Sequence, residues 1–293
     1  MLLTPDCISC VYNASLAAIR ELTSDEHAIK ELIADIMQIP SLQGLHWSLT
    51  SPEVLELAFM KIADAFNTTD PFKDLKAKQN QKGLELYPWL KELVEASEDS
   101  LQTAVNLAII GNSLDVMWSK GSEDIEPVIR DKLKNSVPRK NFLDFRKRLE
   151  GSERLIYLGD NSGEIVFDKV LIETIKQVTN LEIVFVVRSV PALNDATRTE
   201  AKLVGMDDTT TVIENSIHGP LPGTVLSRCS DEVRDLIGAA DLIISKGGGN
   251  FDTLEGENQI RDKIVFMLMC KCVPYQEYFN TALYSPILWT SSR

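Results

Sequence analysis

The second half of the chain contains short, continuous apolar runs that do not alternate with polar residues. They cover residues 155–158, 183–187, 212–213, 242–244 and 264–269, and segments of helical length separate them. Strands that are buried on both faces of a parallel sheet have this pattern, because helices cover each face. The sequence therefore predicts an α/β fold, in which βαβ units form a Rossmann-like, doubly wound and mainly parallel sheet.

The first half of the chain has apolar residues at helical spacing instead. The period changes at Gly151, which predicts two domains. We expect an N-terminal all-α helical domain over residues 1–150 and an α/β domain over residues 151–293.

One helical stripe in the first half ends in two polar residues. It runs from Leu101 to Ala108, and the same steps of three and four residues then reach Asn112 and Asp115. The pattern assigns both positions to the buried face of the helix. Two interpretations are open: either Gly111 ends the helix and the pair is a solvated cap, or the pair faces a cleft beside the second domain.

The charge of the chain is acidic. It has 30 Lys and Arg residues against 43 Asp and Glu residues, which gives a formal net charge of −13. A protein that binds nucleic acid or an anionic membrane needs a positively charged surface, so neither is expected as a partner. No apolar run approaches the roughly 20 residues of a membrane span, and the first residues lack a signal-peptide pattern. We therefore expect a cytoplasmic protein.

Polar and glycine-rich segments follow three of the apolar runs. In a doubly wound sheet, ligands bind beyond the carboxyl ends of the strands, so these segments are candidate site loops. They are Gly159-Asp160-Asn161-Ser162-Gly163-Glu164 after the first run, Arg188 and Asn194-Asp195-Ala196-Thr197 after the second, and Lys246-Gly247-Gly248-Gly249-Asn250 after the fourth.

Two of these segments offer oxygen ligands, and the third offers an anion cradle. Asp160, Asn161 and Asp195 supply two carboxylates and an amide oxygen, which suit Mg²⁺ or Mn²⁺ better than a soft metal. The glycines after Lys246 would expose backbone N–H groups to a phosphate, with the lysine as cation. Each segment also has a purely structural interpretation: Asp195 as the N-cap of a helix from Ala196, Asp160 and Asn161 as an Asx turn, and the glycines as a flexible turn.

Motifs of several other enzyme classes are absent from the sequence. No GxGxxG fingerprint follows the first run, which disfavours hydride transfer with NAD. No GxSxG elbow and no HExxH motif occur, so a serine triad and zinc-dependent hydrolysis lack support.

Several long motifs carry a family resemblance when they are taken together. They cover residues 159–168, 194–197 and 246–254, and shorter ones lie at 70–73 with Asn80, 111–112 with Asp115, 222–224 and 271–272. In their order and spacing they resemble the domain of unknown function 89 family, whose members are described as metal-dependent damage-control phosphatases. With Cys7-x-x-Cys10 near its start, the chain is similar to the stand-alone prokaryotic branch of that family, and the resemblance covers almost the whole chain.

The resemblance implies a helical domain packed on an α/β domain, and a divalent cation held by Asp160, Asn161 and Asp195. The expected cation is Mg²⁺ or Mn²⁺, with Co²⁺ and Ni²⁺ as alternatives. It further implies that Lys246 contacts the phosphate. Together with the strand ends, it gives a substrate-binding set of Asn112, Asp115, Arg188, Asn194, Gly247, Gly248, Gly249 and Asn250. The chain departs from the family pattern at Gly248, where glutamine is common, and so lacks a side chain there that could reach the substrate.

The leading hypothesis is metal-dependent hydrolysis of a small phosphorylated metabolite, a sugar phosphate or a damaged cofactor precursor. Lys246 would clamp the phosphoryl group, and Asp160 or Glu164 would act as base for a water. Alternatively, Asp160 would attack phosphorus itself, and the sequence leaves both routes open. Rival hypotheses are an S-adenosylmethionine-dependent carboxyl methyltransferase, described for a eukaryotic branch, and a non-catalytic metabolite-binding protein.

The chain has five cysteines, an odd count in a chain long enough to bury its own core, so a disulfide framework is not expected. Cys7 and Cys10 are either inert, buried helix residues, or they meet Cys272 and form a second site that binds a soft metal or responds to oxidation.

Overall fold

The computed structural model describes residues 1–113 and 125–290. Its centre is a six-stranded sheet with the strand order β3-β2-β1-β4-β5-β6. The strands are β1 (Arg154–Leu158), β2 (Glu182–Val187), β3 (Thr211–Glu214), β4 (Leu242–Lys246), β5 (Ile264–Met269) and β6 (Pro286–Thr290). The pairs among β1 to β5 are parallel, and β6 pairs with β5 antiparallel.

The predicted Rossmann-like, mainly parallel sheet is confirmed. Each of the five apolar runs lies in one of the strands β1 to β5. The antiparallel edge strand β6 was not predicted. The strand order reverses between β1 and β4, and such a switch point leaves a crevice at the carboxyl ends of the two strands.

Helices precede the sheet and connect its strands. Within the described residues the α-helices are α1 (Pro5–Leu22), α2 (Glu26–Ile36), α3 (Ser51–Phe66), α4 (Lys73–Glu95), α5 (Ser100–Gly111), α7 (Glu126–Leu133), α8 (Arg139–Glu150), α9 (Glu164–Val178), α10 (Arg198–Leu203), α11 (Asp231–Ala239), α12 (Gly247–Leu254) and α13 (Val273–Phe279).

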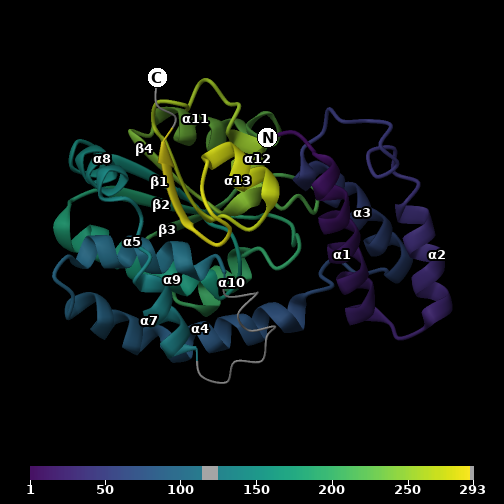
Figure 1. Ribbon diagram of the computed structural model, residues 1–293, viewed down its shortest axis with the longest axis horizontal. Coiled ribbons are helices and arrows are strands. Elements are labelled where there is room, and N and C mark those ends of the chain that lie inside the picture. Colours follow the sequence, from purple (N-terminus) through teal and green to yellow (C-terminus); the bar gives the residue numbers. More distant parts are fainter. Residues whose placement is uncertain (114–124, 291–293) are drawn as a thin grey trace.

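These helices cover both faces of the sheet (Figure 1). On one face, Tyr157 and Phe185 belong to a hydrophobic cluster with residues of α4, α5, α7, α8 and α9. On the other face, Ile156 and Val184 belong to a cluster with residues of α11, α12 and α13. Successive residues of a strand point to opposite faces, so a strand covered on both sides needs apolar residues throughout. This burial explains the continuous apolar runs.

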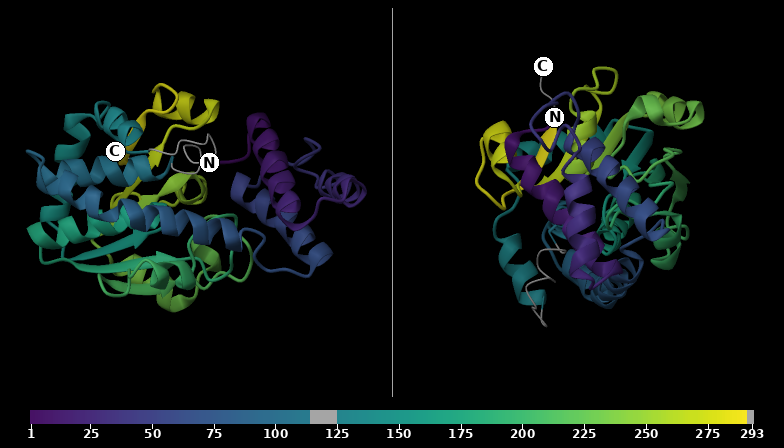
Figure 2. Two further views of the ribbon diagram at one scale, coloured as in Figure 1. Left: turned by 90° about the horizontal axis from the view of Figure 1, so that it is seen from below. Right: turned by 90° about the vertical axis from the view of Figure 1, so that its right-hand side faces the viewer.

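Helices α1, α2 and α3 form a separate group at one end of the molecule (Figure 2), and their buried residues form a third hydrophobic cluster. Helices α4, α5, α7 and α8 instead complete the core of the sheet. The predicted division at residue 150 therefore does not separate two hydrophobic cores. None of the helices in the described ranges has the length and apolar character of a membrane span.

Candidate functional site

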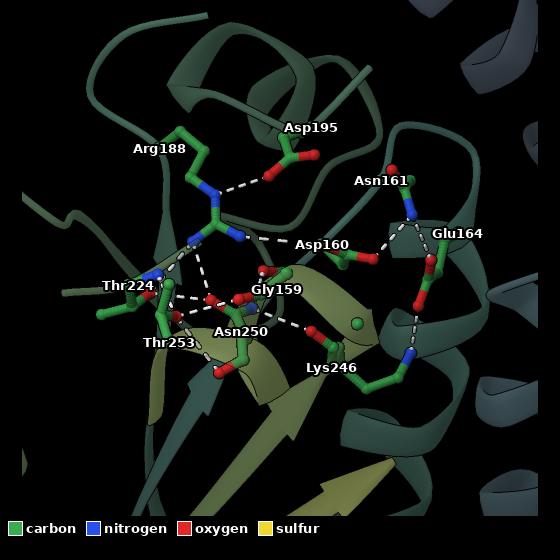
Figure 3. Close-up of polar contacts among 12 residues, drawn as sticks. Gly159, Asp160, Asn161, Glu164, Arg188, Asp195, Thr224, Lys246, Asn250 and Thr253 are labelled. Atoms are coloured by element: carbon green, nitrogen blue, oxygen red, sulfur yellow. Dashed lines mark hydrogen bonds and ion pairs between the residues drawn. The ribbon is translucent and has the colours of Figure 1, made fainter. Parts of the chain in front are cut away.

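The loops that follow β1 and β2 are joined at the carboxyl edge of the sheet. The N–H of Ala196 donates to the carbonyl oxygen of Asp160 at 2.8 Å, and Asn161 and Asp195 form an isolated β-bridge. Asp195 is not an N-cap, because α10 is capped by Thr197. The three residues predicted to hold a cation thus lie side by side (Figure 3).

Two buried carboxylates face each other across these loops. Asp160 is 7% exposed and Asp195 is 2% exposed. Oδ2 of Asp160 accepts hydrogen bonds from Nδ2 of Asn112 at 3.0 Å and from Nδ2 of Asn161 at 2.7 Å. Burial raises the pKa of Asp160 well above its usual range, and the negative charges of Asp195 and Glu164 raise it further. A cation among these groups would offset that repulsion.

The ligand atoms that remain suit a hard cation. Oδ2 of Asp195 accepts a hydrogen bond from Arg188. The other carboxylate oxygen of Asp195 and the amide oxygen of Asn161 take part in no hydrogen bond within residues 1–113 and 125–290. Across the same ranges, no three His, Cys, Asp or Glu side chains form a metal-binding group. The candidate set is therefore two carboxylates and one amide, which leaves positions for water or substrate.

Arg188 brings a buried guanidinium group to the same place. Its Nε donates to Oδ2 of Asp195 at 2.7 Å, and its Nη1 donates to Oγ1 of Thr224 and Oδ1 of Asn250, both at 3.0 Å. Its Nη2 lies 3.8 Å from Oδ1 of Asp160 and has no hydrogen-bond partner among the described residues. A buried donor without a partner is costly, so this nitrogen is a candidate ligand for an anion.

Asn250 holds Arg188 and does not face a ligand. Its oxygen accepts hydrogen bonds from Arg188 at 3.0 Å and Thr224 at 2.8 Å. Its nitrogen donates to the carbonyl oxygens of Gly159 at 3.0 Å and Lys246 at 2.8 Å. The protein thus uses both atoms of the amide fully. Asn250 joins the ends of β1 and β4 and positions Arg188, which differs from the expected contact with substrate.

Lys246 also differs from its expected role. It is the last residue of β4, and its side chain lies on the face that α5 and α9 cover. Its Nζ donates to the carbonyl oxygen of Ala108 at 2.9 Å, to Oε1 of Glu164 at 2.7 Å and to Oδ1 of Asp168. Burial alone would lower the pKa of Lys246, but the two carboxylates outweigh burial and raise it. All three ammonium protons have acceptors, so none is directed at a phosphate.

Glu164 is bound through both of its carboxylate oxygens. Oε1 accepts from Lys246, and Oε2 accepts from Asn112 and Asn161, both at 3.0 Å. Burial alone would raise the pKa of Glu164, but Lys246 and the two amides outweigh burial and lower it. A carboxylate with a lowered pKa is a weak base, which disfavours the role expected for Glu164.

Glycines at the start of α12 permit close packing at the site. Gly247 has a φ of +76°, and a Cβ added there would lie 1.8 Å from Oδ2 of Asp160. A Cβ on Gly249 would lie 1.9 Å from the carbonyl oxygen of Pro222. The absence of side chains therefore brings the first turn of α12, whose N–H groups are unpaired within the helix, against the Asp160 carboxylate.

Asn112, which continues the apolar stripe of α5, faces the site. Helix α5 ends at Gly111, as one interpretation expected, but Asn112 is only 2% exposed and is not a solvated cap. Its Nδ2 donates to Asp160 and Glu164. Asp115 lies outside the described residues.

Helix α4 and Lys271, the second residue after β5, also contribute to the site. Asn80 and Lys271 lie in the motifs of the family resemblance, which assigned neither of them a role. Nδ2 of Asn194 donates to Oε1 of Gln79 at 3.2 Å, and the N–H of Gly163 donates to Oδ1 of Asn80 at 2.7 Å. Burial raises the pKa of Asp160, and the positive charge of Lys271 opposes this rise. Strand-end reasoning applied to the fifth apolar run would have found Lys271. Of the two α4 residues, Asn80 belongs to a motif of the family resemblance, whereas Gln79 belongs to none.

Cys7, Cys10 and Cys272 are free thiols. The pKa of Cys272 is raised to about 11, chiefly by burial and to a smaller extent by Asp252, Cys7 and Cys10. No metal-binding group that includes them occurs in the described part of the chain. A soft-metal or redox site at these residues stays a prediction.

The fold and the site define a class of protein. An open, doubly wound sheet with buried carboxylates, amides and an arginine at its switch point is suited to bind a small anionic ligand together with a cation. Comparison with known proteins identifies the family within this class. A model of the damage-control phosphatase ARMT1-like domain matches residues 3–285, and the chain belongs to this family.

Individual relatives agree with this assignment. The chain is 29% identical over 276 residues to the damage-control phosphatase of Archaeoglobus fulgidus, which covers 94% of each protein. It is 28% identical over 268 residues to a damage-control phosphatase of Pyrococcus horikoshii, which covers 91% of this chain and 90% of the relative. The crystal structure of a DUF89 family protein from Pyrococcus horikoshii matches all of both chains with a TM-score of 0.88 at 25% identity. The predicted family is thus confirmed.

Proposed function

We propose that this protein is a metal-dependent phosphatase in metabolite damage control, which hydrolyses a phosphomonoester of a small metabolite such as a sugar phosphate or a damaged cofactor precursor. One observation carries the proposal: Nη2 of the buried Arg188 has no hydrogen-bond partner among the described residues and lies beside the buried carboxylates of Asp160 and Asp195. A guanidinium group binds phosphoryl oxygens, and paired carboxylates hold a divalent cation. Relatives named damage-control phosphatase support the same reaction class.

Asp160, Asn161 and Asp195 would hold the cation, Mg²⁺ or Mn²⁺. One oxygen of Asn161 and one of Asp195 accept no hydrogen bond from the described part of the chain, and the pKa of Asp160 is raised; both observations support this assignment. When bound, the cation would offset the carboxylate charges, polarise a phosphoryl oxygen and lower the pKa of a water. An acidic protein with a net charge of −13 would otherwise present carboxylates that repel its own phosphate substrate.

The residues of the chain would bind and orient the phosphoryl group. Arg188 would donate to it through Nη2, while Thr224 and Asn250 hold the guanidinium group through Nη1. The first turn of α12 would add N–H groups. Asp160 either accepts the proton of the attacking water or attacks phosphorus itself. In both routes the bond from phosphorus to the metabolite oxygen breaks, and the leaving alcohol gains a proton. When water attacks, inorganic phosphate forms directly. When Asp160 attacks, a water would then hydrolyse the aspartyl phosphate, which releases inorganic phosphate and restores the carboxylate.

Phosphate release from a panel of sugar phosphates and cofactor phosphates tests the proposal. The protein is treated with EDTA, and Mg²⁺ or Mn²⁺ is then restored. We expect release only with the cation, and a loss of roughly 100-fold or more in Asp195→Ala. The matched control is Asp131→Ala, which removes an exposed carboxylate on α7 and keeps the activity. Release that is indifferent to EDTA, or that survives in Asp195→Ala, contradicts the proposal.

A rapid quench followed by mass spectrometry separates the two routes of Asp160. Attack by Asp160 leaves one phosphoryl group on this residue during turnover, whereas attack by water leaves none.

A further inference from the structure

The side-chain amide of Asn161 could turn either its oxygen or its nitrogen toward a cation, and only the oxygen would bind. Two carboxylates decide the orientation. Nδ2 of Asn161 lies 2.7 Å from Oδ2 of Asp160 and 3.0 Å from Oε2 of Glu164. Because an ionised carboxylate only accepts hydrogen bonds, the reversed amide would set its oxygen against the negative oxygen of Glu164, and against that of Asp160 once the cation holds Asp160 ionised.

Glu164 is itself fixed from the core of the protein. Oε1 of Glu164 lies 2.7 Å from Nζ of Lys246, and the two side chains are 1% and 0% exposed. Lys246 is anchored in turn by Asp168 and by the carbonyl oxygen of Ala108. A continuous chain of contacts therefore runs from the buried ammonium group through Glu164 to the amide of Asn161 (Figure 3).

The same carboxylate also sets Asn112. Nδ2 of Asn112 lies 3.0 Å from Oε2 of Glu164, and its Oδ1 accepts a hydrogen bond from the N–H of Met269 at 3.3 Å. Glu164 thus draws the N–H groups of two amides, Asn112 and Asn161, toward one carboxylate oxygen. This arrangement leaves the oxygen of Asn161 on the side away from Glu164, where no protein donor among the described residues uses it.

We propose that Glu164 and Lys246 are positioning residues that turn the amide oxygen of Asn161 toward the divalent cation. Their role rests on the proposed cation site. Neither residue then acts as a base or touches the phosphate, because both act through Asn161.

The variant Glu164→Gln tests the orientation directly. Lys246 would keep its bond to the oxygen of Gln at position 164, so the new NH₂ group would face the NH₂ groups of Asn112 and Asn161. Asn161 would then turn its oxygen toward residue 164 and away from the cation. We expect the Kd for Mn²⁺ to rise roughly tenfold or more, as for other residues that orient metal ligands. The measurement is a titration of the metal-free protein with Mn²⁺ alone, followed by electron paramagnetic resonance.

Two further variants separate orientation from charge and from general damage to the core. Glu164→Asp keeps the negative charge but withdraws its oxygens from the amides, so its Mn²⁺ affinity should also fall. Tyr157→Phe is the matched control, because Tyr157 donates to Asp168 at 2.7 Å in the same buried cluster and is bonded to neither amide. Its Kd for Mn²⁺ should stay within about twofold of the wild-type value.

A double-mutant cycle decides the mechanism. Aspartate at position 161 has an oxygen on both sides and needs no orientation, so Glu164→Gln should cost much less Mn²⁺ affinity in the Asn161→Asp background. Equal losses in both backgrounds would show that Glu164 acts by charge alone, and would overturn the inference. Unchanged affinity in both Glu164→Gln and Glu164→Asp would overturn it as well. Wild-type protein that does not bind Mn²⁺ would instead remove the proposed cation site, and the positioning role with it.

Discussion

Nε of Arg188 donates to Oδ2 of Asp195 at 2.7 Å, and both side chains are buried. This ion pair joins the proposed phosphate ligand to a proposed cation ligand. Burial raises the pKa of Asp195, and Arg188 opposes that shift with its charge and its hydrogen bond. A buried charge without a partner is costly, so each residue depends on the other. The pair therefore fixes the geometry of the site before any ligand binds.

The variant Arg188→Lys tests this arrangement. Lysine keeps the positive charge but lacks the planar set of donors that reaches Asp195, Asn250 and a phosphoryl oxygen together. We expect kcat/KM for phosphate release to fall roughly 100-fold or more, and inhibition by inorganic phosphate to weaken. Steady-state kinetics measure both. Arg234→Lys, which changes the exposed ion pair with Asp231 on α11, is the control and should behave like the wild type. A wild-type rate in Arg188→Lys would exclude Nη2 as a phosphate ligand.

Much of this fold could be predicted, because burial of both sheet faces produces continuous apolar runs. The sequence also predicts which residues meet at the site, because the topology alone brings the ends of neighbouring parallel strands together. These residues are Asp160, Asn161, Asp195 and Arg188. Strand β6 (Pro286–Thr290) could not be predicted in the same way. It is an edge strand with a short apolar run behind a proline, and nothing local to it indicates an antiparallel partner.

The direction of individual side chains could not be predicted from the pattern. Lys246 ends β4 and Asn250 lies in the first turn of α12 directly after it, in the predicted segment, but both side chains are bound by the protein. A strand residue faces one side of the sheet or the other, and what covers each side depends on helices far away in the sequence. For Lys246 these are α5 and α9, which supply its three acceptors.

Close packing at the start of α12 gives a second prediction. A Cβ on Gly249 would lie 1.9 Å from the Pro222 carbonyl oxygen, which is backbone and cannot turn aside. We expect Gly249→Ala to lower the free energy of unfolding by roughly 1–3 kcal/mol, as overpacked cores do. Gly256→Ala is the matched control, because a Cβ there meets nothing within 4 Å. Urea unfolding of both variants makes the comparison, and equal stabilities would contradict the packing.

The hydroxyl group of Tyr275 occupies the space of a side chain at position 248. A Cβ on Gly248 would lie 2.5 Å from Oη of Tyr275. We therefore expect Gly248→Gln to destabilise the wild-type chain but to be better tolerated together with Tyr275→Leu. A double-mutant cycle of unfolding free energies should give a coupling of roughly 1 kcal/mol. Additive effects would mean that the two positions do not compete for space.

The contact between Tyr275 and Asp252 predicts that the free energy of unfolding depends on pH. Its Oη lies 3.0 Å from both the Gly248 carbonyl oxygen and Oδ1 of Asp252, and one hydroxyl proton cannot serve both acceptors. Burial raises the pKa of Asp252 to about 7, so the protonated carboxyl group can donate to Tyr275. Because the folded state holds this proton more tightly than the unfolded chain, the stabilisation is complete below the unfolded pKa. It is lost as the pH rises through about 7.

The variant Asp252→Asn keeps a hydrogen-bond donor at every pH. Its free energy of unfolding, measured in urea at a series of pH values from acidic to mildly alkaline, should decline less with rising pH than that of the wild type. Parallel profiles for the two proteins would show that Asp252 does not carry this proton.

A variant of Lys246 distinguishes a role of this residue in stability from a role in phosphate binding. Lys246→Met removes the ammonium group and leaves Glu164 and Asp168 buried without their cation. Breaking a buried ion pair from one side typically costs roughly 3–5 kcal/mol, so we expect a large fall in the free energy of unfolding. Lys263→Met is the control, because Nζ of Lys263 donates to the backbone of Gly238 at an exposed position, and its stability should change little. A phosphate ligand would behave in the opposite way: Lys246→Met would unfold at the wild-type urea concentration and lose only its activity.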